Sequence, residues 1–216
     1  GDLSSGSMKY TFCACALALL TMGCSFQTEI MVGESSDHTR PKLVVGITVD
    51  QMRSDYLTRF GVWDDDASPA TFGEGGFRRM VEEGFTCRDH HFGYAPTYTG
   101  PGHASIYTGT TPKVHGIIGN DWYDRASGTS VYCASDTSVK GVNGDGVDFN
   151  GLVLGSSGQM SPHRMLSTTL GDELKMATGG QAKVYGASMK DRGAILPAGH
   201  GADGAYWFYG KDLGHF

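Results

Sequence analysis

Apolar runs separated by glycine, proline and polar residues predict alternating strands and helices along most of the chain. Leu43–Val49 is a continuous apolar, β-branched run that ends at Asp50. Such a run is typical of a central parallel strand that is covered on both faces. Four further strands are predicted at Phe85–Tyr94, Ser130–Cys133, Lys183–Ala187 and Ala205–Tyr209.

Helical spacing of apolar residues predicts a short helix after Asp50, a helix over Phe77–Glu83 and another over His103–Thr108. A longer helix is expected from Ser161 to about Ala177, because Ser161-Pro162 combines a good N-cap with proline at the first helical position. Strands that alternate with helices and end in polar residues indicate an α/β fold with a mainly parallel central sheet flanked by helices.

The first 41 residues indicate targeting rather than a fold. Residues 1–7 resemble a cloning remnant that precedes a native start at Met8, and residues 8–24 have the basic and apolar regions of an export leader. Gly23-Cys24-Ser25 resembles a lipoprotein cleavage site with Cys24 as the acylated residue, and an ordinary secretory cleavage near Cys24 is the alternative. Residues 25–41 are polar and are expected to be a linker. Both alternatives predict a periplasmic domain, and lipidation of Cys24 would attach it to the outer membrane.

Net charge and cysteine content limit the possible partners and predict one covalent link. The formal net charge of −6 argues against nucleic acid as the main partner. Outside the leader the chain keeps only Cys87 and Cys133. Because an exported protein meets an oxidising compartment, these two cysteines are predicted to form a disulfide.

A turn rich in glycine and proline carries the candidate chemistry. Thr97 and Thr99 lie just before the predicted helix at His103. Such a turn brings a side-chain oxygen to a helix N-terminus, where free N–H groups and the helix dipole favour anions. Our hypothesis is that Asp50 holds a metal ion and that one of the two threonines, with Thr99 preferred, attacks phosphorus beside it.

Three motifs together resemble the alkaline phosphatase superfamily, in its type I phosphodiesterase/nucleotide pyrophosphatase branch. They are Val49-Asp50, Thr99-Gly100-Pro101-Gly102-His103 and the run from Thr108 to Ile117. Two more motifs, Gly119–Tyr123 and Lys190–Ala194, resemble the phosphate-irrepressible alkaline phosphatases (PafA type) within that branch rather than its diesterases.

This resemblance implies a zinc phosphomonoesterase that works through a phosphothreonine intermediate on small phosphate esters. Asp50 would be a ligand of one of two zinc ions, and Thr99 would be the nucleophile bound to the same ion. Asn120, Lys190 and Arg192 match positions that contact the non-reacting phosphoryl oxygens. The Lys190/Arg192 pair favours a monoester, since two cations suit its greater negative charge.

Members of the family are much longer, and their remaining zinc ligands lie in the second half of their chains. Residues 42–216 are therefore expected to be an N-terminal part of the catalytic domain, and this part would lack several of the metal ligands. The protein is also expected to be a monomer. Two alternatives stay open: a phosphodiesterase or nucleotide pyrophosphatase on the same scaffold, and an inactive fragment that only binds phosphate. His103 and His115 are expected to be structural.

Overall fold

The computed structural model describes residues 41–62, 72, 75–141 and 155–208. The chain divides into two compact units, residues 1–46 and 47–216. Residues 41–46 form neither helix nor strand, and all helices and strands of the described residues lie in the second unit. The predicted leader with Cys24 and the linker up to residue 40 lie outside the described residues. Within the described ranges, no helix combines the length and the apolar character that crossing a membrane requires.

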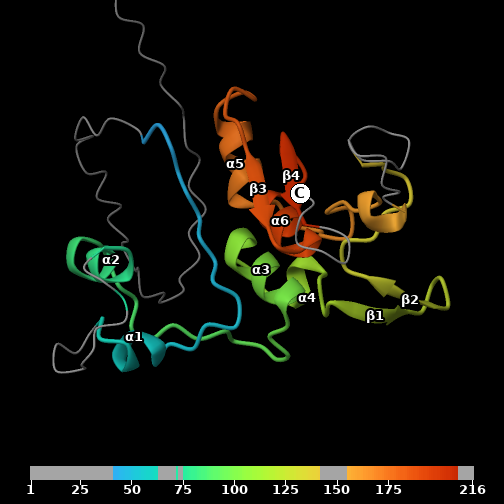
Figure 1. The fold of residues 1–216 in the computed structure, drawn as a ribbon. Helices are drawn as coiled ribbons and strands as arrows, with labels where there is room; N and C mark the ends of the chain where they lie inside the picture. The colour runs from blue at the N-terminus through green and yellow to red at the C-terminus, as the bar shows by residue number, and fades with distance from the viewer. Residues whose placement is uncertain (1–40, 63–71, 73–74, 142–154, 209–216) are drawn as a thin grey trace, which may run out of the picture. The chain divides into compact units, whose positions relative to one another are not determined.

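Six α-helices and four short strands make up the described part of the second unit (Figure 1). The helices are α1 (Tyr56–Arg59), α2 (Phe77–Glu83), α3 (Thr99–Thr108), α4 (Pro112–His115), α5 (Leu170–Ala177) and α6 (Asp191–Ala198), and Gly155–Gly158 form a 3-10 turn. The strands are β1 (Asp121–Asp124), β2 (Thr129–Tyr132), β3 (Tyr185–Ser188) and β4 (Gly204–Trp207).

The strands form two separate pairs. β1 and β2 are an antiparallel hairpin, whereas β3 and β4 run parallel and are joined through α6. The strands at Lys183–Ala187 and Ala205–Tyr209 are confirmed with slightly shifted bounds as β3 and β4. The helix α6 that joins them was not predicted from the sequence. Among the described residues a larger, mainly parallel central sheet is not confirmed.

Close packing of α6 on β3 fixes where the end of β3 lies. A Cβ atom added to Gly186 of β3 would overlap the carbonyl oxygen of Ala194 in α6, so only glycine allows this approach. α6 also packs against α3 and β4 (Figure 1). Lys190 and Arg192 therefore lie where β3 ends and α6 begins, which is the usual position of ligand-binding groups in α/β sheets.

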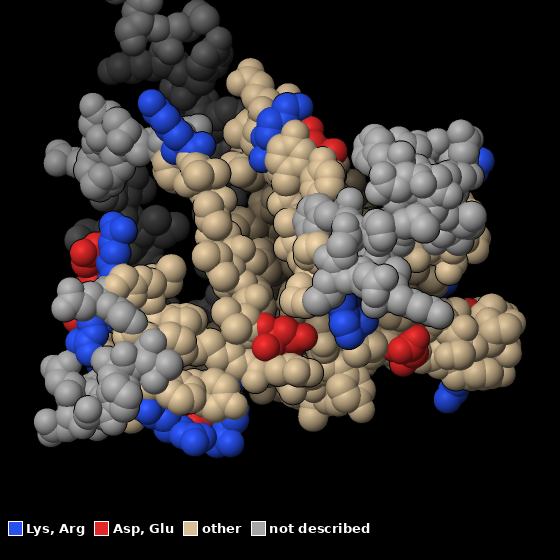
Figure 2. Space-filling model, viewed as in Figure 1, with Lys and Arg blue, Asp and Glu red and all other residues tan. Residues whose placement is uncertain are grey.

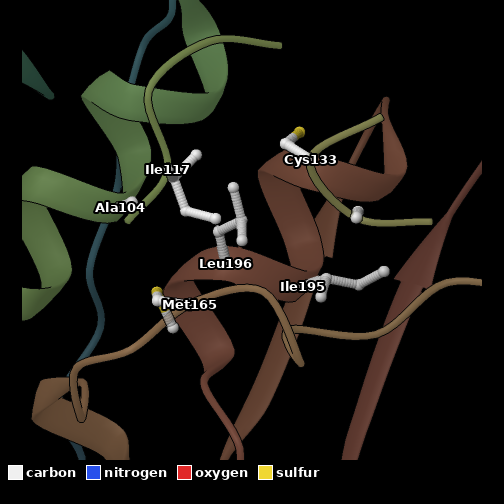
Figure 3. Packing of buried hydrophobic residues seen from close by; sticks show 7 residues of the cluster. Ala104, Ile117, Cys133, Met165, Ile195 and Leu196 are labelled. Carbon is white, nitrogen blue, oxygen red and sulfur yellow. The ribbon is translucent and has the colours of Figure 1, made fainter. Parts of the chain in front are cut away.

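A small apolar core joins α3, α6 and the hairpin. It consists of Ala104, Ile117, Cys133, Ala134, Met165, Ile195 and Leu196, each at most 3% exposed. Figure 3 shows Ile117 and Leu196 directed toward each other, with Cys133 on the hairpin side of α6. Since apolar burial is the main favourable term in folding, this cluster is what holds α3, α6 and β2 together.

Two predicted strands are wrong. Leu43–Val49 has no strand pairing, and Ile47 and Val49 are 70% and 52% exposed. Phe85–Tyr94 is likewise irregular, and Phe85 is 92% exposed. A β-branched apolar run becomes a strand only by pairing with a neighbour, and no described residue pairs with either segment.

The helix predictions had mixed outcomes. The helix after Asp50 is confirmed as α1, and α2 has the predicted bounds with Gly84 as its C-cap. α3 begins at Thr99, four residues before the predicted start at His103. It ends at Thr108, and its C-cap Gly109 has a left-handed φ of 67°.

The predicted helix start at Ser161 is wrong, since α5 begins only at Leu170. Thr169 and Asp172 form a capping box there, and the Asp172 carboxylate also accepts from the Gly201 amide at 2.6 Å. The Ser161 hydroxyl instead donates to Asp136 and accepts from the His163 amide in a local turn. A cap that is also bonded to a distant loop thus outweighs the local signal at Ser161.

The predicted Cys87–Cys133 disulfide is also wrong, because both thiols are free. Cys87 is exposed, while Cys133 is buried in the core cluster. Burial raises the pKa of the Cys133 thiol to about 12, so this group stays neutral and acts as a small apolar side chain.

Candidate active site

Thr99 is the first residue of α3, and its side chain reaches Asp50. The Thr99 Oγ1 hydroxyl donates to Asp50 Oδ2 at 3.1 Å. Tyr98, which is extended, forms the N-cap without capping through its side chain, so the first amides of α3 are left for other partners. Thr97 is exposed and precedes the helix. The contact with Asp50 thus supports the preference for Thr99 over Thr97.

Asn120 is held against the same helix end. The Gly100 amide donates to Asn120 Oδ1 at 2.7 Å. Because a backbone N–H can only donate, the amide oxygen of Asn120 faces the helix and its NH₂ group is left to donate elsewhere. A Cβ atom at position 100 would lie 3.2 Å from Asn120 Oδ1 and 3.3 Å from Cys133 Sγ. Glycine therefore allows the residue after Thr99 to approach both groups closely.

Arg192 lies in the first turn of α6 and is half buried. Its Nη1 donates to the Tyr132 hydroxyl at 3.0 Å, and that hydroxyl donates to Asp191 Oδ1 at 2.6 Å. Burial, the largest influence, opposes the charge of Arg192, but its hydrogen bond to Tyr132 and the nearby Asp191 hold its pKa above the ordinary value. Arg192 is therefore a fixed cation.

The contacts bring four of the five predicted site residues into one connected chain. Asp50 bonds Thr99, Gly100 bonds Asn120, and the Cys133 amide donates to the Asn120 carbonyl at 2.8 Å. Cys133 follows Tyr132, which bonds Arg192. Lys190 is not part of these contacts among the described residues, and it lies exposed as the N-cap residue of α6.

Tyr132 and Asp191 were missed by the sequence analysis. Tyr132 is one of 10 tyrosines and lies inside a short predicted strand, so nothing in the local pattern marks it. Asp191 lies between Lys190 and Arg192, and that position is the only local signal. Its role appears only when the hairpin packs beside α6.

Asp50 and Thr99 offer two oxygen donors that one cation could share, which is the chemistry the metal hypothesis requires. A zinc site in proteins has four ligands, of which at least three are protein side chains. No group of three or more His, Cys, Asp or Glu residues within the described ranges could hold a metal ion. Asp50 and Thr99 therefore fit as part of a metal site, and the described residues do not complete it.

Both histidines of the motif bond neighbouring groups. His103 Nδ1 lies 2.8 Å from the Thr99 carbonyl oxygen and so donates to it. The Ile117 amide donates to His115 Nδ1 at 3.1 Å, which leaves the proton on Nε2, 2.9 Å from the Ser105 hydroxyl. Burial lowers the pKa of His115, which is therefore neutral. These contacts agree with the structural roles that the sequence predicted.

Charge on the face shown in Figure 2 is divided into small groups of each sign rather than gathered in one broad basic surface. A few cations at the end of β3 suit a small anion better than a polyanion, whose binding needs many basic contacts.

The fold and the motifs define a family. Residues 44–194 match the family model of type I phosphodiesterase / nucleotide pyrophosphatase, and this chain belongs to that family.

Among its relatives are two alkaline phosphatases. PafA of Elizabethkingia meningoseptica and PhoV of Synechococcus elongatus are each 50% identical to this chain over 169 residues, which cover 78% of this chain and 28% of either relative. The crystal structure of wild-type PafA superposes with a TM-score of 0.70 at 49% identity, covering 79% of this chain and 30% of PafA. A PafA variant with one Thr→Ser and three substitutions by Ala, of Asn, Lys and Arg, matches with the same TM-score at 47% identity. The chain thus spans less than a third of the length of these relatives.

Proposed function

We propose that this chain carries the nucleophile and phosphate-binding part of a zinc-dependent alkaline phosphatase that hydrolyses phosphate monoesters. The carrying observation is the arrangement at the start of α3. Thr99 bonds Asp50 at 3.1 Å, and the next amide bonds Asn120 at 2.7 Å. A hydroxyl, a carboxylate and an anion-binding helix end therefore converge at one point.

In the proposed reaction, the Thr99 hydroxyl gives up its proton to solvent, and its Oγ1 forms a bond to phosphorus while the bond from phosphorus to the ester oxygen breaks. The alcohol leaves with a proton from solvent, and phosphate remains on Thr99 as a phosphothreonine. Water then attacks this phosphorus, which releases inorganic phosphate and restores the hydroxyl. Splitting one displacement into two easier steps is the usual benefit of a covalent nucleophile.

Asp50 positions Thr99 through their hydrogen bond, and both residues would hold one of the two zinc ions expected in the complete enzyme. Zinc would lower the pKa of the Thr99 hydroxyl and neutralise charge on the phosphoryl group. Thr99 lies at the N-terminus of a helix of 10 residues, whose first amides and dipole favour the same negative charge.

Asn120, Lys190 and Arg192 would bind the phosphoryl oxygens that do not react. The Asn120 NH₂ group is left to donate, because its oxygen is engaged by Gly100. Arg192 is a half-buried cation with a raised pKa, and Lys190 extends from the adjoining N-cap position. Hydrogen bonds from charged donors to phosphate are about twice as strong as neutral ones.

The substitutions in the PafA variant support the roles proposed for Thr99, Asn120, Lys190 and Arg192. The threonine and the asparagine that it alters are as far apart in PafA as Thr99 and Asn120 are here. Its altered lysine and arginine are separated by one residue, as Lys190 and Arg192 are. This agreement in residue type and order, and in the spacing within each pair, favours a shared role.

Specific observations favour two alternatives to a phosphomonoesterase. The family name favours a phosphodiesterase or nucleotide pyrophosphatase on this scaffold. The two-residue donor set of Asp50 and Thr99 favours a chain that binds phosphate without turnover. We place monoester hydrolysis first because two cations at the start of α6 suit a dianionic monoester.

We further propose that residues 8–24 direct export to the periplasm, either as a cleaved leader or as a lipoprotein signal with Cys24 acylated. The intact mass of the mature N-terminus would separate the two: acylation adds the mass of lipid to Cys24, and simple cleavage does not.

The deciding experiment compares phosphate monoester and diester hydrolysis by the complete, zinc-loaded protein and by its Arg192→Ala variant. We expect the wild type to prefer the monoester, and Arg192→Ala to lose roughly 100-fold or more on the monoester but much less on the diester. Arg79→Ala is the matched control, since Arg79 pairs with Glu83 on the exposed face of α2. A wild type that prefers the diester, or an equal loss on both substrates, would contradict the monoesterase assignment.

A further inference from the structure

A tyrosine of the β1–β2 hairpin is the described partner of the Arg192 guanidinium. Arg192 Nη1 donates to the Tyr132 hydroxyl at 3.0 Å. Arg192 Nε is buried and has no hydrogen-bond partner among the described residues. Within that part of the chain, the orientation of the guanidinium therefore depends on the Tyr132 hydroxyl.

Asp191 fixes the direction of that hydroxyl. Tyr132 donates to Asp191 Oδ1 at 2.6 Å, and the same oxygen accepts from the Arg192 amide at 2.7 Å. A phenolic oxygen that gives its proton to a carboxylate keeps its lone pairs for a donor. The proton order is thus fixed: Arg192 donates to Tyr132, and Tyr132 donates to Asp191.

The hairpin that carries Tyr132 also carries Asn120 at its base. Tyr132 pairs with Asp121 in the register of β1 and β2, and the Cys133 amide donates to the Asn120 carbonyl at 2.8 Å. Next to Tyr132, the side chain of Cys133 is buried in the core shared with α6. The same hairpin therefore contacts both Asn120, at its base, and Arg192, through Tyr132.

We infer that Tyr132 is a positioning residue for phosphate binding, which orients the Arg192 guanidinium and keeps it at a fixed distance from Asn120. The inference rests on the proposed function. It adds that the selectivity for monoesters depends on a hydroxyl that itself touches no substrate. Burial raises the pKa of Tyr132 above its ordinary value, so the hydroxyl keeps its proton under alkaline conditions as well.

Tyr132→Phe tests this directly, because phenylalanine keeps the ring over which the Arg192 guanidinium lies, 5.9 Å from its centroid, and removes only the hydroxyl. In the complete, metal-loaded protein we expect a loss of roughly 10- to 100-fold in kcat/KM for the monoester, as misplacement by about 1 Å can cost that much. The loss for a diester should be several-fold smaller. Tyr123→Phe, in β1 of the same hairpin and 66% exposed, is the matched control and should change neither rate.

A double-mutant cycle separates positioning from a structural role. In the Arg192→Ala background, Tyr132→Phe should cost less than about 2-fold, since the group that it orients is gone. An equal cost in both backgrounds, or an unchanged rate in Tyr132→Phe alone, would overturn the inference. If Tyr132→Phe lowers Tm, Asp191→Asn is the second variant. It keeps an acceptor oxygen, removes the charge that orients the hydroxyl, and should likewise reduce monoester turnover non-additively with Arg192→Ala.

The affinity for inorganic phosphate, measured by titration calorimetry, tests the role of Tyr132 separately from the proposed phosphatase activity. Absence of monoester turnover in the wild type would reject the phosphatase but leave phosphate affinity measurable. We then expect Tyr132→Phe to weaken the Kd for phosphate roughly 10-fold. If Tyr132→Phe leaves the Kd for phosphate unchanged while Arg192→Ala weakens phosphate binding, only the role of Tyr132 is rejected. A wild type that binds no phosphate would reject both proposals.

Discussion

The two sides of Thr99 are built differently. On one side, Asn120 and Arg192 are carried by the hairpin and by α6, whose side chains meet in the buried core around Leu196. On the other, Asp50 ends a segment whose Ile47 and Val49 are 70% and 52% exposed. Buried packing and hydrogen bonds among the described residues thus hold the proposed phosphate-binding side. The segment that ends at Asp50 instead contacts α3 through the Thr48–Tyr107 and Thr99–Asp50 hydrogen bonds.

This contrast predicts which substitutions should change stability and which should change activity. A side chain that packs in the core affects both stability and the position of the site. Substitution of an exposed side chain such as Asp50 should affect the chemistry proposed for it and change stability little. The activity and zinc-binding variants test that separation in the complete protein, beginning with the residue where the two sides meet. The stability variants test it in this chain, to which the exposed fractions refer.

Thr99→Ala should have the largest effect. Without the hydroxyl there is no nucleophile and no bond to Asp50, so we expect monoester turnover to fall by about 1,000-fold or more with a nearly unchanged Tm. Thr99→Ser should keep measurable activity, because it retains an oxygen at the same atom. Steady-state rates of the purified variants measure this. Thr97→Ala is the control. An inactive Thr97→Ala variant together with an active Thr99→Ala variant would show that Thr97 is the nucleophile.

Leu196→Ala compared with Ile47→Ala tests the contrast in packing. Leu196 is fully buried in α6, so its truncation should lower the free energy of unfolding by about 2–5 kcal/mol. Ile47 is largely exposed, and the same truncation there should cost less than about 0.5 kcal/mol. Urea unfolding followed by circular dichroism gives both values. Equal losses would mean that the segment before Asp50 is as well packed as α6, and the contrast would fail.

Asp50→Asn should weaken zinc binding about 10-fold or more while leaving the free energy of unfolding of the zinc-free protein nearly unchanged. Asparagine keeps the shape and an acceptor for Thr99 but loses the charge that a cation needs. Competition with a chromophoric chelator measures the zinc affinity. Asp89→Asn is the matched control, since Asp89 is an exposed acid that pairs with nearby His91. Unchanged zinc affinity in Asp50→Asn would remove Asp50 from the metal site.

Local signals predicted what depends on neighbours in the sequence. α2 has the predicted bounds because its apolar spacing and Gly84 are both contained in one short segment. The strand that became β3 was recognised for the same reason. The candidate residues Asp50, Thr99, Asn120, Lys190 and Arg192 came from motifs, and four of them are linked by the observed contacts.

Features that depend on tertiary contacts could not be predicted from the sequence. The start of α5 depends on Asp172, whose carboxylate bonds the amide of Gly201, 29 positions away. The disulfide prediction rested on the expected compartment, which says nothing about Cys133 pointing into the core. Tyr132 lies in no motif, and it reaches Arg192, 60 positions away, only through the packing of the hairpin on α6.

The pH dependence of stability gives the smallest expected effect and tests the packed side alone. Burial lowers the pKa of His115, whose Nδ1 accepts from Ile117, so the folded state takes up a proton less readily than the unfolded state. The contribution of His115 to the free energy of unfolding should therefore be constant well above pH 6.5. It should fall as the pH drops below that value, by about 1.4 kcal/mol for each unit of pKa shift. Urea unfolding at pH 7.5 and 5.5 measures the fall.

Two variants isolate the contribution of His115 from that of other titrating groups. His115→Gln cannot take up the proton, so its free energy of unfolding should be lower at pH 7.5 but should depend less on pH than that of the wild type. His91→Gln, at an exposed residue paired with Asp89, should keep the wild-type dependence. Identical pH profiles in all three proteins would mean that the folded state accommodates a protonated His115. The hydrogen bond from the Ile117 amide would then be broken at little cost, and the packed side of the site would be less rigid than its burial implies.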